Sequence, residues 1–322
     1  MTIDEPALGF SERVSLASAR VPWRVKLTAV YVVIAAVLVW LFWAADFDIA
    51  WIRAHAEFVF KGLTFTIVLA VGAIALACVM ALIGSLCRLS KNPVLFGLSG
   101  FYTSFFRGTP LIVQLFLIYL ALPQLAIGLG NQSLETALTL TAFQAGIIGL
   151  GLNYGAYMTE IFRAGIQSVS GGQWEAAEAL GMKYTQRMRR VILPQAVRVI
   201  IPPTGNEFIA MIKDTALVSF LGVAVAQAEV FRRAQLVGQA DFKMLEALLL
   251  AAGIYWGLTA IFTFFQTKLE RRLSKGYDRN VQAQVQRKSR WFSTGGGGGY
   301  GGGATMVEIP DSGGPEIGTQ GH

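Results

Sequence analysis

The chain contains the stretch Glu175-Ala176-Ala177-Glu178-Ala179-Leu180-Gly181, and Ile192-Leu193-Pro194 follows eleven residues later. Alanine, leucine and glutamate are strong helix formers, so the first stretch predicts a short polar helix. Very apolar sequence lies on both sides of it. A membrane protein has little use for an organised polar helix between two apolar spans unless another protein docks there. We therefore treat this segment as a candidate docking site, and the surrounding apolar sequence as the frame that holds it.

The composition indicates an integral membrane protein. Apolar residues make up 54% of the 322 residues and charged residues 15%, whereas a soluble domain carries about a quarter charged residues. The net charge of +7 does not indicate a nucleic-acid partner, because the Lys and Arg residues lie beside apolar spans, where they set membrane topology.

Six segments are long and apolar enough to cross a bilayer, which takes about 20 residues of helix. They predict an all-α, polytopic membrane bundle of about six transmembrane helices. Residues 1–26 are too long and polar for a signal peptide, so the first apolar segment is predicted to stay as a membrane anchor. The third segment is interrupted by Arg107, Gly108 and Pro110, and the fifth by Pro202 and Pro203 together with several charges. The segments are 27–45, 60–87, 103–123, 138–162, 199–224 and 245–267.

Basic residues predict the orientation, because cytoplasmic loops are enriched in Lys and Arg. With six spans, the basic clusters before residue 27, after residue 87, in the loop 163–198 and after residue 267 share one side. That side is predicted to be the cytoplasm, and both termini lie there. The opposite loop 124–137 has no Lys or Arg, whereas the last outer loop carries three basic residues against this trend: Arg232, Arg233 and Lys243.

The sequence offers no enzyme chemistry. It lacks the glycine-rich phosphate loop that ends in Gly-Lys-Ser/Thr, and it lacks hydrolase and zinc-site motifs. With His55 and His322 as its two histidines, it predicts neither a metal site nor a catalytic residue. Cys78 and Cys87 lie roughly 13 Å apart along one predicted helix, too far for a disulfide. The glycine-rich tail from about residue 293 is predicted to be disordered.

The polar loop 163–198 predicts two helices. The first begins near Ser170, a favourable N-cap, and ends at Gly181, while the second runs from about Tyr184 to Ile192 and stops before Pro194. Small alanines would let the first helix approach a partner closely. Arg187, Arg189 and Arg190 can pair with the partner or with lipid phosphates. The alternative is an amphipathic cytoplasmic helix that rests on the bilayer.

Further motifs surround this loop in a fixed order. They are Phe106-Arg107-Gly108-Thr109-Pro110-Leu111, Val113-Gln114-Leu115-Phe116, Tyr154 to Ser168, Leu193-Pro194-Gln195-Ala196-Val197-Arg198, Pro202-Pro203-Thr204-Gly205-Asn206-Glu207 and Lys213-Asp214-Thr215-Ala216-Leu217.

This set resembles the permease subunits of ATP-binding-cassette (ABC) importers, in the branch that carries histidine, glutamine, glutamate, arginine and opines. The resemblance covers residues 57–270 and implies the type I ABC importer permease fold. It implies that the loop 163–198 is the EAA loop that grips the ATPase. The ATPase-coupling residues on this basis are Glu175, Ala176, Ala177, Glu178, Gly181, Leu193 and Pro194.

The resemblance also implies partners: ABC ATPase subunits, a periplasmic or extracellular solute-binding protein, a second permease subunit (identical or homologous) and membrane lipid. ATP and Mg would bind to the ATPase, so this chain needs no cofactor of its own. The expected location is the bacterial cell inner membrane. Two features depart from the family pattern, namely the additional N-terminal span 27–45 and the tail 271–322.

Charges inside the spans suggest a substrate pathway, because a buried ionisable residue costs several kcal/mol unless it faces a cavity or a partner. A zwitterionic amino acid needs a donor for its carboxylate and an acceptor for its ammonium group. Lys213 is expected to neutralise Asp214 or other polar groups nearby. The candidate pathway residues are Gln114, Asn153, Tyr157, Glu160, Glu207 and Asp214.

Other interpretations stay open at the level of sequence. The same polar residues could form a structural network that fixes helix packing, and Glu160 could simply lie at the membrane interface. An ion-coupled secondary transporter would use Glu160, Glu207 or Asp214 for protons and need no ATPase. A channel or membrane scaffold would need no charge cluster in mid-membrane.

Overall fold

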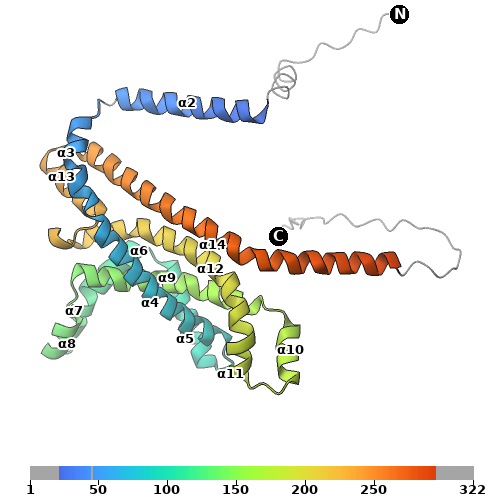
Figure 1. The fold of residues 1–322 in the computed structure, drawn as a ribbon. Coiled ribbons are helices and arrows are strands. Elements are labelled where there is room, and N and C mark those ends of the chain that lie inside the picture. Colours follow the sequence, from blue (N-terminus) through green and yellow to red (C-terminus); the bar gives the residue numbers. More distant parts are fainter. Residues whose placement is uncertain (1–21, 45, 295–322) are drawn as a thin grey trace, which may run out of the picture. The chain divides into compact units, whose positions relative to one another are not determined.

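The computed structural model describes residues 22–44 and 46–294, with side chains left out at residues 38, 41, 42 and 274–294. Most of the predicted N-terminal segment 1–26 and nearly all of the predicted disordered tail lie outside the described residues. Every regular element in the described part is a helix (Figure 1).

The N-terminal half begins with the additional helix α2 and ends with the long helix α9. Its elements are α2 (Trp23–Ala44), α3 (Ile49–Phe60), α4 (Leu63–Leu89), α5 (Pro93–Gly108), α6 (Leu111–Phe116), a π-helical turn (Leu117–Ala121), α7 (Leu122–Gly128), α8 (Gln132–Leu138) and α9 (Ala142–Gln167).

The C-terminal half contains the polar loop and the last two long helices. Its elements are α10 (Gly171–Ala179), α11 (Tyr184–Arg187), a π-helical turn (Met188–Ile192), α12 (Leu193–Asp214), 3-10 turns (Thr215–Leu221 and Val225–Gln227), α13 (Val230–Ala240) and α14 (Met244–Thr294).

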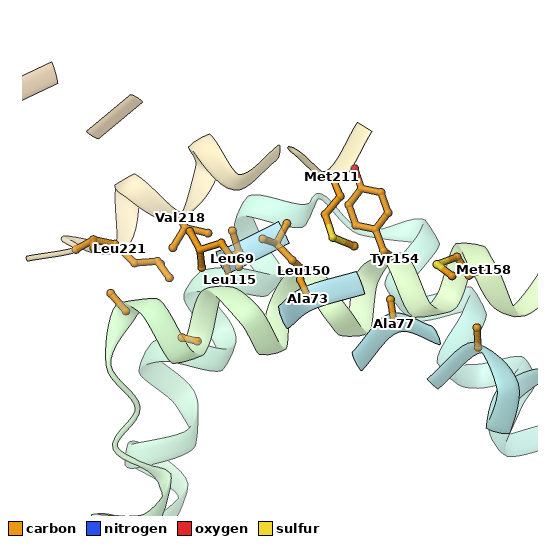
Figure 2. Packing of buried hydrophobic residues seen from close by; sticks show 14 residues of the cluster. Leu69, Ala73, Ala77, Leu115, Leu150, Tyr154, Met158, Met211, Val218 and Leu221 are labelled. Atoms are coloured by element: carbon orange, nitrogen blue, oxygen red, sulfur yellow. The ribbon is translucent and has the colours of Figure 1, made fainter. Parts of the chain in front are cut away.

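The core forms where α4 packs along α9 and where α6 and α12 close over the pair (Figure 2). Small residues allow the close approach. Ala73, Ala77 and Ala81 of α4 are fully buried, and a Cβ at Gly151 or Gly155 of α9 would collide with side chains of α4. Small residues at helix contacts are typical of membrane bundles, where packing replaces the hydrophobic effect as the driving force.

Three helices of the described part are long and apolar enough to cross a membrane, namely α4, the run Leu111–Gly128 and the segment Met244–Leu273 of α14. Helices α8 and α9, which are bent by 74° relative to each other, form a fourth candidate if they are counted as one broken span. These match the predicted spans 60–87, 103–123, 245–267 and 138–162. At the other two predicted spans, α2 and α12 are helical but do not belong to this group.

The predicted third span, 103–123, was wrong in its start. Helix α5 ends at Gly108, Thr109 is extended with φ −119° and ψ 150°, and the apolar run begins at Leu111. The physical cause is Pro110, because the residue before a proline is pushed out of the helical region. Residues 103–108 therefore belong to a separate helix, α5.

The predicted stop before Pro194 was also wrong. The chain passes from α11 through the π-helical turn Met188–Ile192 directly into α12, with Pro194 in its first turn. A proline is tolerated there because its missing N–H has no role at a helix start. Pro202 and Pro203 likewise lie inside α12 without ending it, and Gln266 Nε2 of α14 donates to the Pro202 carbonyl oxygen at 2.7 Å.

Candidate functional site

Helix α10 presents a small polar surface with an apolar tip. Glu175, Ala176 and Ala179 are exposed, and Leu180 at the helix end is 80% exposed. Ala177 is buried and faces the protein. Leu180 is therefore part of the exposed surface of α10 that a partner could contact.

The turn after α10 is closed by its backbone. Gly181 has φ +72°, its N–H donates to the Glu178 carbonyl oxygen at 2.8 Å, and the Met182 N–H donates to the Ala177 carbonyl oxygen at 3.2 Å. This pair of bonds is the Schellman motif, which needs a left-handed residue at the position of Gly181. Glycine adopts that conformation without strain, so it sets the exit angle of the loop.

The loop is fastened to the ends of two long helices. Trp174 of α10 packs against a buried cluster that joins the end of α9 to the start of α12, and its ring lies 6.1 Å from the Tyr184 ring. Glu178 Oε2 pairs with Arg187 Nη1 at 2.8 Å. The cluster consists of Ile166, Val169, Met188, Ile192, Ala196 and Ile200.

The structure divides the predicted coupling residues into two groups. Leu193 is half-buried against the same cluster and Ala177 is buried, so these two support the loop from inside. The other five lie at the surface, where a partner could contact them: Glu175, Ala176, Glu178, Gly181 and Pro194. Their role in ATPase coupling stays a prediction.

Gln114 and Asn153 form one buried amide network. Gln114 Nε2 donates to the carbonyl oxygens of Phe106 and Thr109 at 2.9 and 3.0 Å and to Thr109 Oγ1 at 2.7 Å. Asn153 Nδ2 donates to the Phe106 carbonyl oxygen at 3.0 Å and to Gln114 Oε1 at 2.9 Å. The two side chains thus satisfy the backbone at the break between α5 and α6, which favours a structural role.

A second group brings together charged side chains of α5 and α12 and two tyrosines of α9. The Arg107 guanidinium lies 5.3 Å from the centre of the Tyr157 ring, and Tyr154 OH donates to Asp214 Oδ2 at 2.8 Å. Glu207 is within electrostatic range of both Arg107 and Asp214. One cationic side chain from α5 therefore shares a region with two carboxylates of α12. Asp214 takes the Tyr154 hydroxyl as its partner, and Lys213 is exposed.

Glu160 lies apart from that charge group. Its carboxylate pairs with Arg163 Nε of α9 at 2.7 Å and Arg88 Nε of α4 at 3.6 Å, and all three side chains are half-buried. These contacts link the ends of α4 and α9 next to the polar loop. The geometry fits the interfacial interpretation of Glu160 better than a place in the pathway.

The structure adds three residues that the sequence alone does not single out. Arg107 and Tyr154 lie within the ordered motifs, and Glu229 lies between the predicted spans 199–224 and 245–267. Glu229 is fully buried, caps α13 by accepting from the Phe231 and Arg232 N–H groups at 2.7 and 2.6 Å, and accepts from Tyr255 OH at 2.5 Å. A lone acid between apolar neighbours (Ala228 and Val230) was the available signal.

The surroundings of Glu229 have two opposite effects on the pKa of its carboxyl group. Burial raises the pKa of the Glu229 carboxyl, and the hydrogen bonds from Tyr255 and the two backbone N–H groups counter that rise. Among the described residues, no group of three or more His, Cys, Asp or Glu side chains is placed to hold a metal ion.

Comparisons with known proteins agree with this arrangement. Residues 80–275 match the family described as the binding-protein-dependent transport system inner membrane component. The probable amino-acid permease protein YxeN of Bacillus subtilis (strain 168) is 45% identical over 217 residues, 67% of this chain and 92% of that protein. The probable amino-acid ABC transporter permease protein PatM of Vibrio harveyi is 42% identical over 233 residues, 72% of this chain and 99% of that protein.

A solved structure titled as an amino acid ABC transporter with histidines is 35% identical, with a TM-score of 0.61 over 70% of this chain and 99% of that chain. This similarity confirms the predicted all-α type I importer permease fold, and nothing in it supports the alternative of an ion-coupled secondary transporter. The fold, the polar loop and the family match lead to one assignment. The chain belongs to the binding-protein-dependent transport system inner membrane components and is a multi-pass permease of the inner membrane.

Proposed function

We propose that this chain is the permease subunit of an importer of polar amino acids, and that a separate ABC ATPase drives it. The observation that carries the proposal is the ordered loop, in which a Schellman turn at Gly181 holds α10 with Leu180 exposed at its tip. Relatives named as amino-acid permeases support the choice of cargo. ATP and Mg bind to the ATPase in this proposal, and this chain holds neither.

The loop is suited to transmit motion because it contacts the helices at both of its ends. Trp174 contacts the cluster that joins α9 to α12, and the Glu178–Arg187 ion pair ties α10 to the segment that leads into α12. A displacement of α10 by the ATPase would therefore move the ends of α9 and α12 together. Packed helices shift as units between discrete arrangements, so this motion would reopen the bundle on its other side.

The charge group in the membrane is our candidate for the amino-acid pathway. Arg107 offers donors for a carboxylate, while Glu207 and Asp214 offer acceptors for an ammonium group. Tyr157, which is exposed beside Arg107, would line the same path. Tyr157, Glu207 and Asp214 lie on α9 and α12, the two helices that the loop would move, whereas Arg107 lies on α5.

The remaining parts of the proposal concern assembly and orientation. A second permease subunit would complete the translocation path, and a solute-binding protein would deliver the amino acid from outside. The loop 163–198 and both termini would lie in the cytoplasm, as the distribution of Lys and Arg indicates. Bilayer lipid would cover the remaining apolar surface.

Reconstitution into proteoliposomes with the cognate ATPase and binding protein tests this function. We expect uptake of a polar amino acid only when ATP and the loaded binding protein are both supplied. A matched sample with a hydrolysis-deficient ATPase should show no uptake. Uptake that follows an imposed proton or sodium gradient, with no need for ATP, would overturn the proposal.

A further inference from the structure

The additional helix α2, which the sequence predicts to be a span, has no packing partner in the described part of the chain. Residues Val30 to Ile34 are five consecutive positions, and each is between 48% and 63% exposed. Consecutive helical residues point about 100° apart, so five of them sample every face. None of the faces of α2 is therefore covered by the described part of the protein.

Helix α14 presents an open apolar groove beside α3 and α4. Its volume is about 550 Å³, and side chains such as Ile52, Leu63 and Ile254 line it. Gly253 and Gly257 also line it, and a Cβ added to either would meet no atom within 4 Å. Glycines four residues apart on one helix face form the surface on which another transmembrane helix packs closely.

The end of α2 is tied to the start of α14. Asp48, which follows α2 by four residues, pairs through Oδ2 with Lys243 Nζ at 3.6 Å. Trp51 Nε1 donates to Asp241 Oδ2 at 2.6 Å, and His55 Nε2 lies 3.3 Å from the same oxygen. Four residues of chain reach at most about 14 Å, so the C-terminal end of α2 stays near the N-terminal end of α14.

We propose that α2 packs antiparallel to α14 and fills this groove. Ala35 lies nine residues before the end of α2, and Gly253 lies nine residues after the start of α14. At 1.5 Å per residue both lie about 14 Å from the tethered ends, so small side chains of Ala35 and Ala36 meet Gly253 at the same depth. In the same register, Tyr31 lies at the depth of Gly257.

The short link between the end of α2 and the start of α14 favours α2 over a second copy or lipid as the occupant of the groove. A short linker gives α2 an effective concentration in the millimolar range at the groove, whereas a second copy must associate from the surrounding membrane. Lipid tails could fill the groove, but only a helix gains the close backbone contact that two glycines permit. The packing of α2 against α14 does not depend on the cargo or on the ATPase.

Cysteine cross-linking in native membranes tests the proposal. The background is the full chain with Cys78→Ala and Cys87→Ala, and with a protease site inserted at the exposed Gly130. Gly253→Cys is combined in turn with a single cysteine at each of residues 33, 34, 35 and 36, which together sample every face of α2. After oxidation and cleavage, an intramolecular cross-link keeps the two fragments together on a non-reducing gel.

We expect Gly253→Cys to cross-link within one chain at the α2 positions on one face. The matched control is Ala252→Cys, which is exposed at the same depth but does not line the groove, and there the cross-link should be lost. Cross-links between two chains would assign the groove to a second copy and overturn the proposal. Equal cross-linking at 252 and 253, or none, would overturn it as well.

A second pair of cysteine positions tests the proposal even if a variant of the first pair fails to insert into the membrane. Gly257→Cys with cysteines at residues 30 to 33 should give the same pattern one turn deeper, and Gly253→Leu should abolish it by closing the groove. Each variant is first checked for normal membrane yield. If the Gly253→Leu variant reaches normal yield and still cross-links, α2 does not occupy the groove.

Discussion

Replacing Gly181 tests whether the backbone turn after α10 positions the docking surface. Its φ of +72° is a left-handed conformation that costs an alanine about 1–2 kcal/mol. A Cβ at this position would meet no atom within 4 Å, so Gly181→Ala adds backbone strain and no steric clash. That free energy corresponds to a shift of about 5–30-fold between the closed turn and alternative conformations.

The assay is a titration of the purified permease in nanodiscs with its ATPase. If the ATPase binds only the closed turn, its apparent affinity falls by at most the same factor of about 5–30. Gly181→Asn should lose less, because Asn tolerates the left-handed region better than alanine. Gly181→Asp should uncouple uptake while the protein still inserts into the membrane.

Gly172→Ala is the matched control. Gly172 lies in the first turn of the same helix, is exposed, has open space around its Cβ position and does not have a positive φ. Alanine should strengthen the helix there by about 0.5–1 kcal/mol and leave ATPase binding intact. Unchanged ATPase affinity together with unchanged uptake in Gly181→Ala and Gly181→Asp would refute the docking role of the turn.

Two further predictions concern the hydrogen-bonded carboxylates Asp214 and Glu229. Asp214→Ala should impair uptake without weakening ATPase binding, and normal uptake kinetics in this variant would assign Asp214 a structural role. Tyr154→Phe removes only the hydrogen bond to Asp214, and it should lower the melting temperature because a hydrogen bond to a charged group is worth about 1.5–3 kcal/mol. Glu229→Ala should lower the free energy of unfolding by about 2–4 kcal/mol, since it removes a helix cap and the buried acceptor of the Tyr255 hydroxyl. The exposed Glu57→Ala is its control in a thermal-unfolding assay in detergent, and equal melting temperatures would contradict the assigned role of Glu229.

The first loop helix could be predicted from sequence because its signals are local. The predicted start at Ser170 and stop at Gly181 match α10, whose first helical residue is Gly171 and whose closing turn contains Gly181. Helix formers and a terminal glycine act through the conformations of neighbouring residues alone. No knowledge of the packing partner is needed for such a prediction.

The prolines show where local reasoning fails. Pro110 and Pro194 carry the same restriction, since each lacks an N–H and disfavours a helical residue before it. At Pro110 the chain becomes extended at Thr109, and Gln114 and Asn153 satisfy the free backbone groups. At Pro194 a π-helical turn, Met188–Ile192, comes just before the proline, and the helix continues through it. Packing of the neighbouring helices decides between these outcomes.

For a related reason, the sequence predicts only part of the candidate pathway. Its residues stand out in the sequence as polar positions within apolar spans, and that property does not reveal which of them are in contact. The structure joins Gln114 to Asn153, and it surrounds Asp214 with Tyr154 and Glu207. Glu160, chosen by the same criterion, pairs instead with Arg88 and Arg163.

Hydropathy and helix signals act over a few neighbouring residues, so the sequence alone predicts a helical membrane bundle with an organised polar loop. The pairing of buried polar groups, the positions of the helix breaks and the location of the groove on α14 follow only from the packing of the helices. A buried polar side chain must take its partner from whichever helix face packs against it. That partner lies 60 residues away for Tyr154 and Asp214, and 26 residues away for Glu229 and Tyr255.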